Sequence, residues 1–333
     1  MKKIILFDKN PLYDKYILND SNLKIYFIQE KTYSNYFINK FSRIVLYLKF
    51  FFLIKIFNIK LVVCTIYNSV FISKMINLLP GIKFLVIQHY TTFEYEQKKL
   101  KKLNLGIFCC FGENQKKINK KHNVQKYELI GSPTYSIFKS LNPNLHKRKF
   151  KLCYVSQWTP DSIKNLKDLN EPKIYNLLKL EKNLKKYLLK YDHSIVFALR
   201  EEKKSNEFEY FRSNFGDRGL INIRNNYFDT YELMNNSDVT ITGWSTCAYE
   251  AFADNNKVMF NPYNSKDLQL VHNETCVINN DSFDFFEKKL NNLLQMTEDQ
   301  FYKETYLDQK KIIDKNCLQN AHLKIKQIIQ LYS

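Results

Sequence analysis

The sequence is poor in glycine, proline and cysteine, with seven of each among its 333 residues. So little glycine and proline excludes collagen-like repeats and a chain dominated by flexible linkers. The cysteines are odd in number and form no Cys-x-x-Cys pair, so we expect free thiols in a reducing compartment and no structural zinc. With 45% hydrophobic and 25% charged residues, the composition is globular. The length suits two α/β domains of about 150 residues each.

Acidic residues are scarce in the first half of the chain only. Residues 1–150 hold 26 Lys and Arg against eight Asp and Glu, a net charge of +18, whereas residues 151–333 hold 25 of each sign. An AT-rich genome raises lysine along a whole chain, but it does not explain acids missing from one half. A basic N-terminal domain favours an anionic partner, such as a membrane surface, an acidic glycan, a phosphate-bearing acceptor or a nucleic acid.

No apolar run reaches the roughly 18 uncharged residues that a membrane span needs. The most apolar segment, Arg43–Val63, is interrupted by three lysines, and we interpret it as a buried helix followed by a strand. The alternative is a helix lying on a membrane with Phe50–Phe52 immersed. The apolar start of the chain, Met1–Phe7, is too short for a signal peptide, so we expect a cytoplasmic protein.

Short apolar runs alternate with helical patterns, which is typical of parallel sheets with crossover helices. The predicted strands are Lys3–Phe7, Leu23–Gln29, Lys60–Ile66, Lys83–His89, Gly106–Phe111, Lys126–Ile130, Lys151–Ser156, Ser194–Leu199, Leu220–Ile223, Asp238–Thr242 and Lys257–Phe260. The stretch Ser282–Tyr332 is predicted to be helical, and the polar stretch 142–149 is predicted to be a linker. We expect an α/β fold of two doubly wound Rossmann-type domains, 1–141 and 150–333, facing a central cleft.

The segment Ser237–Ala251 carries the clearest functional pattern. A β-branched strand ends at Gly243, and Ser245 and Thr246, which are good N-cap residues, then open a helix. The N–H groups and the positive dipole end of such a helix suit a phosphate. Glu250 lies on the second turn, from which a carboxylate could reach the ribose of a nucleotide. An ordinary capped helix with a surface glutamate is the alternative interpretation.

This segment resembles the donor-binding region of GT-B glycosyltransferases, especially bacterial surface-carbohydrate biosynthesis proteins. The matching pieces are Ser237–Val239, Ser245–Thr246, Tyr249–Ala251, Lys257–Val258 and Phe260–Asn261. Further pieces resemble the same family, in the same order along the chain: Val86–His89, Phe111–Gly112, Gly131–Pro133 and Tyr154–Trp158. The resemblance implies a GT-B-like fold with an acceptor-side N-terminal domain and a donor-binding C-terminal domain. It also implies a nucleotide-sugar substrate, UDP- or CMP-linked, used to build a surface polysaccharide such as a capsule or lipopolysaccharide.

Two features depart from the family's pattern. The glycine expected after Gln-His is Tyr90 here, and its side chain would narrow the acceptor side of the cleft. The strand Ser194–Leu199 ends in Arg200 rather than in the His-Pro pair that CMP-sugar-using relatives often carry. The second departure weakens a CMP-linked donor without excluding it, so the nucleotide and the acceptor stay open.

An inverting transfer needs a base for the acceptor proton and groups that stabilise the leaving phosphate. His89, whose ordinary pKa lies near neutrality, is the predicted base, and Asp161 and Glu113 are alternatives. Arg200 is predicted to neutralise phosphate charge beside the segment Gly243–Thr246.

The remaining candidate residues are predicted to line the cleft. On the acceptor side they are Gln88, Tyr90, Gly131, Ser132 and Trp158. Trp158 and Trp244 could stack on a base or a sugar, although a tryptophan is more often simply part of the core.

The sequence has no Asp-x-Asp signature and no pair of His or Cys at ligand spacing, so we expect no metal and no resident cofactor. The basic clusters between residues 98 and 149 would hold the protein at the inner membrane leaflet if they share one surface. Two alternatives on the same fold are a CDP-polyol phosphotransferase and an enzyme like the UDP-sugar 2-epimerases. Nucleic-acid binding is disfavoured, because no RNP, KH, zinc-finger or helix-turn-helix signature occurs.

Overall fold

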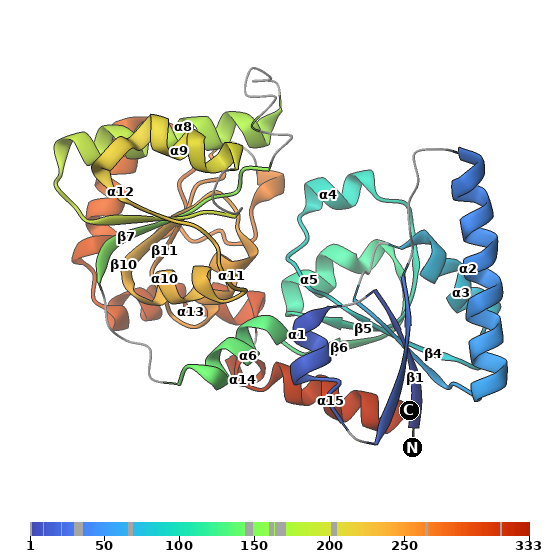
Figure 1. The fold of residues 1–333 in the computed structure, drawn as a ribbon. Helices are drawn as coiled ribbons and strands as arrows, with labels where there is room; N and C mark the ends of the chain where they lie inside the picture. Colours follow the sequence, from blue (N-terminus) through green and yellow to red (C-terminus); the bar gives the residue numbers. More distant parts are fainter. Residues whose placement is uncertain are drawn as a thin grey trace. The chain divides into compact units, whose positions relative to one another are not determined.

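The computed structural model describes residues 2–8, 10–20, 22–29, 36–65, 69–143, 149–159, 163, 171–200, 205–263, 266–313 and 315–333 (Figure 1). Contacts between Cα atoms divide the chain into two compact units. Unit 1 comprises Met1–Thr92, Glu96–Ile137 and Asn316–Ser333. Unit 2 comprises Phe93–Tyr95 and Phe138–Lys315.

Unit 1 is built on a six-stranded parallel sheet with the order β2-β1-β3-β4-β5-β6. Its strands are β1 (Lys2–Phe7), β2 (Leu23–Ile28), β3 (Leu61–Cys64), β4 (Lys83–Ile87), β5 (Asn104–Cys110) and β6 (Asn123–Leu129). The central strands are apolar and buried, as expected for a parallel sheet covered on both faces. In register, Leu85 of β4 lies between Val63 of β3 and Ile107 of β5.

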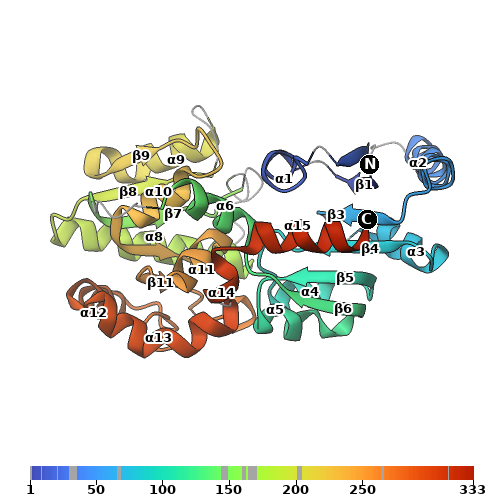
Figure 2. The same ribbon diagram turned by 90° about the horizontal axis from the view of Figure 1, so that it is seen from below.

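Helices cover this sheet. Those lying wholly or partly in unit 1 are α1 (Pro11–Tyr16), α2 (Tyr36–Phe57), α3 (Val70–Leu78), α4 (Glu94–Lys99), α5 (Glu113–Ile118), η1 (Asn119–Lys121), α6 (Pro133–Leu141), α14 (Lys315–Leu318) and α15 (Ala321–Tyr332). Figures 1 and 2 show α2 and α3 side by side. They share one core cluster with the sheet, in which the Phe50 ring stacks on Phe84 at 6.3 Å and meets Phe71 edge-on at 5.7 Å.

The apolar segment Arg43–Val63 forms most of α2 and most of β3. Phe50 is fully buried and Phe51 is half-buried, but Phe52 is 61% exposed. The predicted helix and strand are therefore present, but the helix is buried on one face only. In the part of the chain that the structure describes, no helix has both the length and the apolar character needed to span a bilayer.

Unit 2 contains a five-stranded parallel sheet with the order β11-β10-β7-β8-β9. Its strands are β7 (Phe150–Val155), β8 (Ile195–Ala198), β9 (Leu220–Asn222), β10 (Ser237–Thr242) and β11 (Val258–Phe260). Its helices include α8 (Pro172–Lys190), α9 (Asn206–Phe215), η2 (Gly216–Arg218), α10 (Asp229–Asn235), α11 (Thr246–Ala253), η3 (Lys266–Leu268), α12 (Phe283–Gln295) and α13 (Glu298–Ile312). The two parallel sheets confirm the predicted α/β class with two Rossmann-type units.

The end of the chain packs with the beginning. We expected residues 150–333 to form one domain, but Asn316–Ser333 belongs to unit 1. There α15 buries Ala321, Ile325 and Ile329. The Ser136 hydroxyl contacts His322 Nδ1 at 2.5 Å, and Lys324 Nζ donates to the Leu129 carbonyl at 2.6 Å. The last helix therefore completes the unit that the first strand begins.

Candidate functional site

The candidate residues of unit 2 gather at the carboxyl edge of its sheet. Trp158 follows β7, Arg200 follows β8, and Gly243–Thr246 follows β10. Because β10, β7 and β8 are neighbouring parallel strands, their carboxyl ends meet at one edge, where ligands of doubly wound sheets bind. The structure thus brings these three predicted groups together.

The turn between β10 and α11 is held by Gln157, a residue that we did not predict for the site. Its side-chain oxygen accepts hydrogen bonds from the Trp244 N–H at 2.6 Å and from the Thr242 hydroxyl at 3.2 Å. A Cβ on Gly243 would lie 2.8 Å from the same oxygen, so a larger residue there would displace the Gln157 amide from these bonds. Gln157 ties the end of β7 to the start of α11 and so positions the helix tip.

The tip of α11 is accessible and its cap is unusual. Ser245 is the N-cap residue with extended backbone angles, yet its hydroxyl makes no capping hydrogen bond. Its carbonyl accepts the N–H groups of Ala248 and Tyr249, both at 3.1 Å. Ser245, Thr246 and Cys247 are each half-buried, so the positive end of the helix dipole is open to solvent. This is the geometry that an anionic group needs at a helix N-terminus.

Glu250 is almost completely buried, at 1% exposure. One of its carboxylate oxygens accepts a hydrogen bond from the Tyr231 hydroxyl at 2.5 Å, which joins α11 to α10. Burial raises the pKa of the Tyr231 phenol well above its usual value, and the nearby Cys247 thiol and Glu250 act in the same direction. Burial also raises the pKa of the Cys247 thiol, to about 12. The predicted contact between Glu250 and a ribose stays a prediction.

Trp158 contributes to a buried polar cluster. Its indole N–H donates to Glu181 at 2.6 Å, and the hydroxyls of Tyr154 and Tyr210 donate to the same carboxylate at 2.8 and 2.7 Å. Trp158 has no exposed surface, so in this structure its ring is a core element with no face available for stacking. Trp244 is also buried, at 7% exposure.

Arg200 lies at the end of β8 with its backbone fixed and its side chain exposed. Its N–H donates to Glu207 at 3.0 Å, and the other oxygen of that carboxylate accepts the Ser156 hydroxyl at 2.5 Å. Glu207 is fully buried and links the ends of β7 and β8. The guanidinium of Arg200 is thus carried on a fixed segment at the same edge as the α11 tip.

A further arginine of unit 2, Arg224, was not predicted. It follows β9 and is half-buried, and its charge lowers the pKa of the Cys247 thiol against the larger effect of burial. Cys247 lies in the first turn of α11, so Arg224 adds positive charge near that tip. The signal available in the sequence was an arginine directly after a predicted strand, the same signal that pointed to Arg200.

The candidate residues of unit 1 also follow neighbouring strands. Gln88 and His89 follow β4, Glu113 follows β5, and Gly131 and Ser132 follow β6. Asp161, the other predicted carboxylate, lies outside the described residues.

Gln88 and His89 have different surroundings. Gln88 is fully buried, where its side chain accepts the Phe111 N–H at 3.0 Å and donates to the Tyr90 carbonyl at 2.8 Å. It also bonds to Gln115, which in turn accepts the Thr92 N–H at 2.8 Å. Gln88 therefore fixes the backbone of the loops on either side.

His89 is an exposed residue, with the ring of Tyr90 against it edge-on at 4.6 Å. Partial desolvation by surrounding protein lowers the pKa of the His89 imidazole below its usual 6.5, although a hydrogen bond to the Thr65 backbone acts in the opposite direction. The imidazole is therefore neutral at pH 7, as a general base must be. Glu113 is exposed and pairs with Lys116 on its own helix at 3.5 Å.

Gly131 and Ser132 together start a helix. Gly131 has a φ of +78°, and a Cβ there would lie 3.0 Å from the Cys317 backbone, so only glycine fits without strain. The Ser132 hydroxyl accepts the Tyr135 N–H at 3.2 Å, and Pro133 opens α6. Ser132 is fully buried in this capping role.

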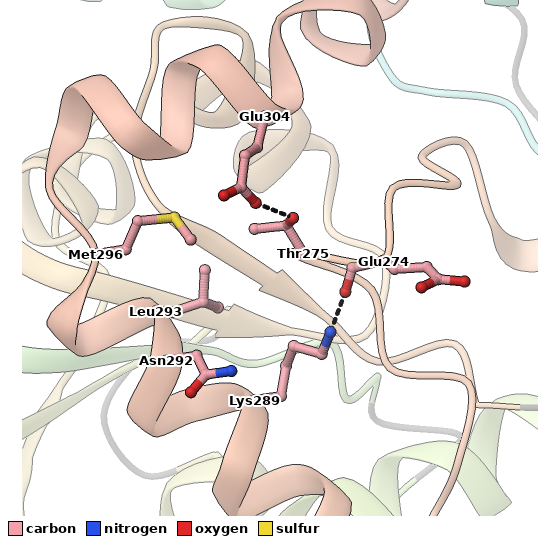
Figure 3. A pocket seen from close by; sticks show the side chains of 7 residues that line it. All are labelled: Glu274, Thr275, Lys289, Asn292, Leu293, Met296 and Glu304. Carbon is pink, nitrogen blue, oxygen red and sulfur yellow. Dashed lines mark hydrogen bonds between the residues drawn. The ribbon is translucent and has the colours of Figure 1, made fainter.

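A separate pocket of about 280 Å³ lies in unit 2, between α12 and α13 (Figure 3). It is lined by Glu274, Thr275, Lys289, Asn292, Leu293, Met296 and Glu304. Its polar groups bond to one another: Thr275 donates to Glu304 at 2.5 Å, and Lys289 donates to the Glu274 carbonyl. None of the predicted site residues lines it. Within the described ranges, no group of three or more His, Cys, Asp and Glu could hold a metal ion.

Comparison with known proteins identifies the fold. No protein-family model matches the sequence, and no curated protein is significantly similar to it. A putative UDP-N-acetylglucosamine 2-epimerase from Listeria monocytogenes is similar in structure, with a TM-score of 0.63 at 9% identity over 100% of this chain and 98% of its own. MnaA of S. aureus in complex with UDP gives 0.62 at 11% identity over 100% and 97%. MurG of Acinetobacter baumannii gives 0.52 at 11% identity over 99% and 100%.

These matches span both units of the chain and nearly the whole length of each solved structure. The chain therefore has the GT-B fold that the sequence resemblance implied. Its structural neighbours are enzymes of that fold, and two of those described here are named for a UDP-sugar reaction or were solved with UDP.

Proposed function

We propose that this protein is a glycosyltransferase that moves a sugar from a nucleotide-sugar donor to a surface-polysaccharide or lipid-linked glycan acceptor. The observation that carries the proposal is the half-exposed tip of α11, whose N-cap hydroxyl makes no capping bond, at the carboxyl edge of the sheet in unit 2. The similarity to an S. aureus structure containing UDP supports a nucleotide as the ligand.

In this proposal the donor's phosphates bind at Ser245 and Thr246 through hydroxyl and backbone N–H groups. Arg200 neutralises the negative charge on the leaving phosphate. Its guanidinium and the dipole of α11 together supply the positive charge that a metal ion supplies in metal-dependent enzymes. Glu250 binds the ribose through its carboxylate. The Tyr231 hydroxyl, which donates a hydrogen bond to the same carboxylate, would either keep that bond beside the ribose or be displaced by it. Unit 1 supplies the acceptor side, with His89 as the base.

The nucleotide part of the proposal is tested by titrating UDP, CMP and CDP into the full chain by calorimetry. Glu250→Gln keeps an acceptor for the Tyr231 hydroxyl but removes the carboxylate charge, and we expect it to weaken nucleotide binding about tenfold or more. Glu209→Gln is the matched control, because Glu209 is exposed on α9 whereas Glu250 is buried on α11. Equal affinity in both variants, or no binding of any nucleotide, would contradict the assignment.

The base is tested separately. His89→Ala should leave nucleotide affinity unchanged and lower turnover by about 100-fold or more, the usual contribution of a positioned base. Because the pKa of His89 lies below 6.5, turnover of the unaltered protein should fall as the pH drops through that lower value. Full activity of His89→Ala would show that another group takes the proton.

A specific observation favours a second function. The two highest TM-scores reported above belong to the putative UDP-N-acetylglucosamine 2-epimerase and to the UDP-bound MnaA structure, rather than to MurG. An epimerase converts its nucleotide sugar without any acceptor. Proton NMR of the protein incubated with UDP-N-acetylglucosamine alone would detect the 2-epimer, and its formation would replace the transferase proposal.

The basic character of unit 1 supports an acceptor presented at an anionic membrane surface. The side chain of Lys121 donates to the carbonyls of Gln97 and Leu100, so the basic clusters at residues 98–102 and 116–121 are neighbours in the fold. We propose that the protein associates peripherally with the inner membrane, where a lipid-linked acceptor is found.

A further inference from the structure

Helix α2 has two apolar faces, and only one of them is covered. Leu46, Phe50 and Ile54 are buried against the sheet and α3. The opposite face carries six large apolar side chains that are 46–68% exposed, Phe41, Ile44, Val45, Leu48, Phe52 and Ile56. Their spacing of three, one, three, four and four residues follows one side of a helix, so they form a continuous strip, here called the α2 stripe.

The α2 stripe lies in a long part of the chain that has basic residues and no acidic ones. From Lys31 to Phe93 the sequence has eight Lys and Arg and no Asp or Glu, a span that includes α2, β3, α3 and β4. Lys49 and Lys55 are exposed, next to Leu48 and Ile56 of the stripe. Lys3 and Lys24 lie over the Phe57 ring at 5.6 and 5.9 Å, at the end of the same helix.

A second copy of this chain and a lipid bilayer are the two surfaces that could cover such a stripe, and the charges beside it favour the bilayer. A second copy of this chain, packed symmetrically, would bring two sets of lysines together without any carboxylate between Lys31 and Phe93 to pair with them. A bilayer with anionic headgroups instead accepts the apolar side chains and neutralises the lysines beside them. Amphipathic helices with a basic rim lie in this way at the headgroup boundary.

We infer that the α2 stripe is the surface by which this protein lies on an anionic lipid bilayer, with its six apolar side chains in the headgroup boundary and Lys49 and Lys55 among the phosphates. This inference deepens the membrane association proposed above and rests on it. The contact differs from the one expected from the sequence, because Phe50 faces the core and Phe41, Ile44, Val45 and Leu48 take its place.

The test is co-sedimentation of the full chain with vesicles of phosphatidylglycerol and phosphatidylcholine in equal parts, against vesicles of phosphatidylcholine alone. The unaltered protein should bind the anionic vesicles preferentially, and less at high salt. The double change Leu48→Ser with Phe52→Ser should lower the partition coefficient about tenfold or more. Its matched control is Leu189→Ser with Leu307→Ser, since those leucines are 59% and 68% exposed, compared with 65% and 61% for Leu48 and Phe52.

The charges are tested by a second pair of variants. Replacing Lys49 and Lys55 by Gln should lower binding roughly fivefold for each lysine. Replacing Lys182 and Lys185, two exposed lysines of α8, should leave it unchanged.

Three results would overturn the inference. In the first, the stripe variants bind anionic vesicles as well as the unaltered protein. In the second, changing Lys101, Lys102, Lys117 and Lys120 to Gln abolishes vesicle binding, while the stripe variants still bind. The protein would then associate with the membrane through another surface. In the third, light scattering shows that the stripe variants convert a dimer into a monomer, so that a second copy covers the stripe. Nucleotide affinity, measured on the same variants, is expected to stay constant, so failure here is distinguishable from failure of the proposed donor site.

Discussion

The buried carboxylate of Glu181 makes the stability of unit 2 depend on pH. Its side chain is 4% exposed and accepts three hydrogen bonds, from Tyr154, Trp158 and Tyr210. Burial raises the pKa of Glu181 from 4.5 to about 7, with the three hydrogen bonds acting against that rise and the nearby Glu207 adding to it. In the folded protein, Glu181 therefore binds its proton more tightly than in the unfolded chain.

The sign of the pH effect follows from this difference. A carboxyl group with a raised folded pKa stabilises the fold fully below its unfolded pKa, and this contribution is lost as the pH rises through the folded pKa. The window here runs from pH 4.5 to about 7. Integrating the two titration curves gives a loss of about 2–3 kcal/mol between about pH 5 and about pH 8.

The assay is urea unfolding followed by tryptophan fluorescence. The chain has two tryptophans, Trp158 and Trp244, and both lie in unit 2, so the signal reports on that unit. Glu181→Gln cannot titrate, so relative to the unaltered protein it should gain about 2–3 kcal/mol as the pH rises over that window. Glu209→Gln, at an exposed position on α9, should give a constant difference. A constant difference for Glu181→Gln as well would refute the reasoning.

Three further changes have defined expectations. Gln157→Leu leaves the Trp244 N–H without its acceptor, so unit 2 should lose about 1–3 kcal/mol and UDP affinity should fall with it, measured by fluorescence and calorimetry. Gly131→Ala places a side chain at a φ of +78°, and about 1–3 kcal/mol should be lost, visible as a lower thermal midpoint. Lys257→Met removes the Nζ that donates to the Leu293 and Met296 carbonyls at 2.9 Å at the end of α12, so urea unfolding should show a loss of about 1–3 kcal/mol. An unchanged midpoint in any of these would show that the contact contributes nothing to stability.

Most strands of the described residues could be predicted from the sequence because they are short apolar runs buried on both faces, whereas the edge strands β2, β6 and β9 are only partly buried. Their parallel arrangement followed from the helical patterns between them. The start signals of two short helices, α1 and α6, are also present in the sequence. Asn10 caps α1 with Pro11 in the first turn, and Ser132 caps α6 with Pro133 in the first turn. Both signals are local and were readable in the sequence.

The partner of the final helix could not be predicted in the same way. The periodicity of Ser282–Tyr332 indicates that one face of each helix is buried, but it carries no information about which sheet covers that face. The domain boundary at residue 150 rested on charge and polarity, which change at the linker and not where the chain returns to unit 1 at Asn316.

For the candidate site, the sequence predicted which residues lie at the carboxyl edge of the sheet, but not which side chains bond to one another there. Residues that follow parallel strands must lie at one edge, which is why Arg200 and Gly243–Thr246 were found together. The bond from Tyr231 to Glu250 joins residues 19 positions apart on two helices, and the one from Trp158 to Glu181 spans 23 positions. Such pairings depend on how helices pack, and no local pattern reveals them.

The return of the chain to unit 1 sets an order of assembly. The segment Asn316–Ser333, which packs in the unit that begins at β1, follows all of unit 2 in the sequence and is therefore synthesised after it. Until α15 is made, Leu129 and Ser136 lack their contacts with Lys324 and His322. Unit 1 therefore acquires its full set of native contacts only after the whole of unit 2 has been synthesised.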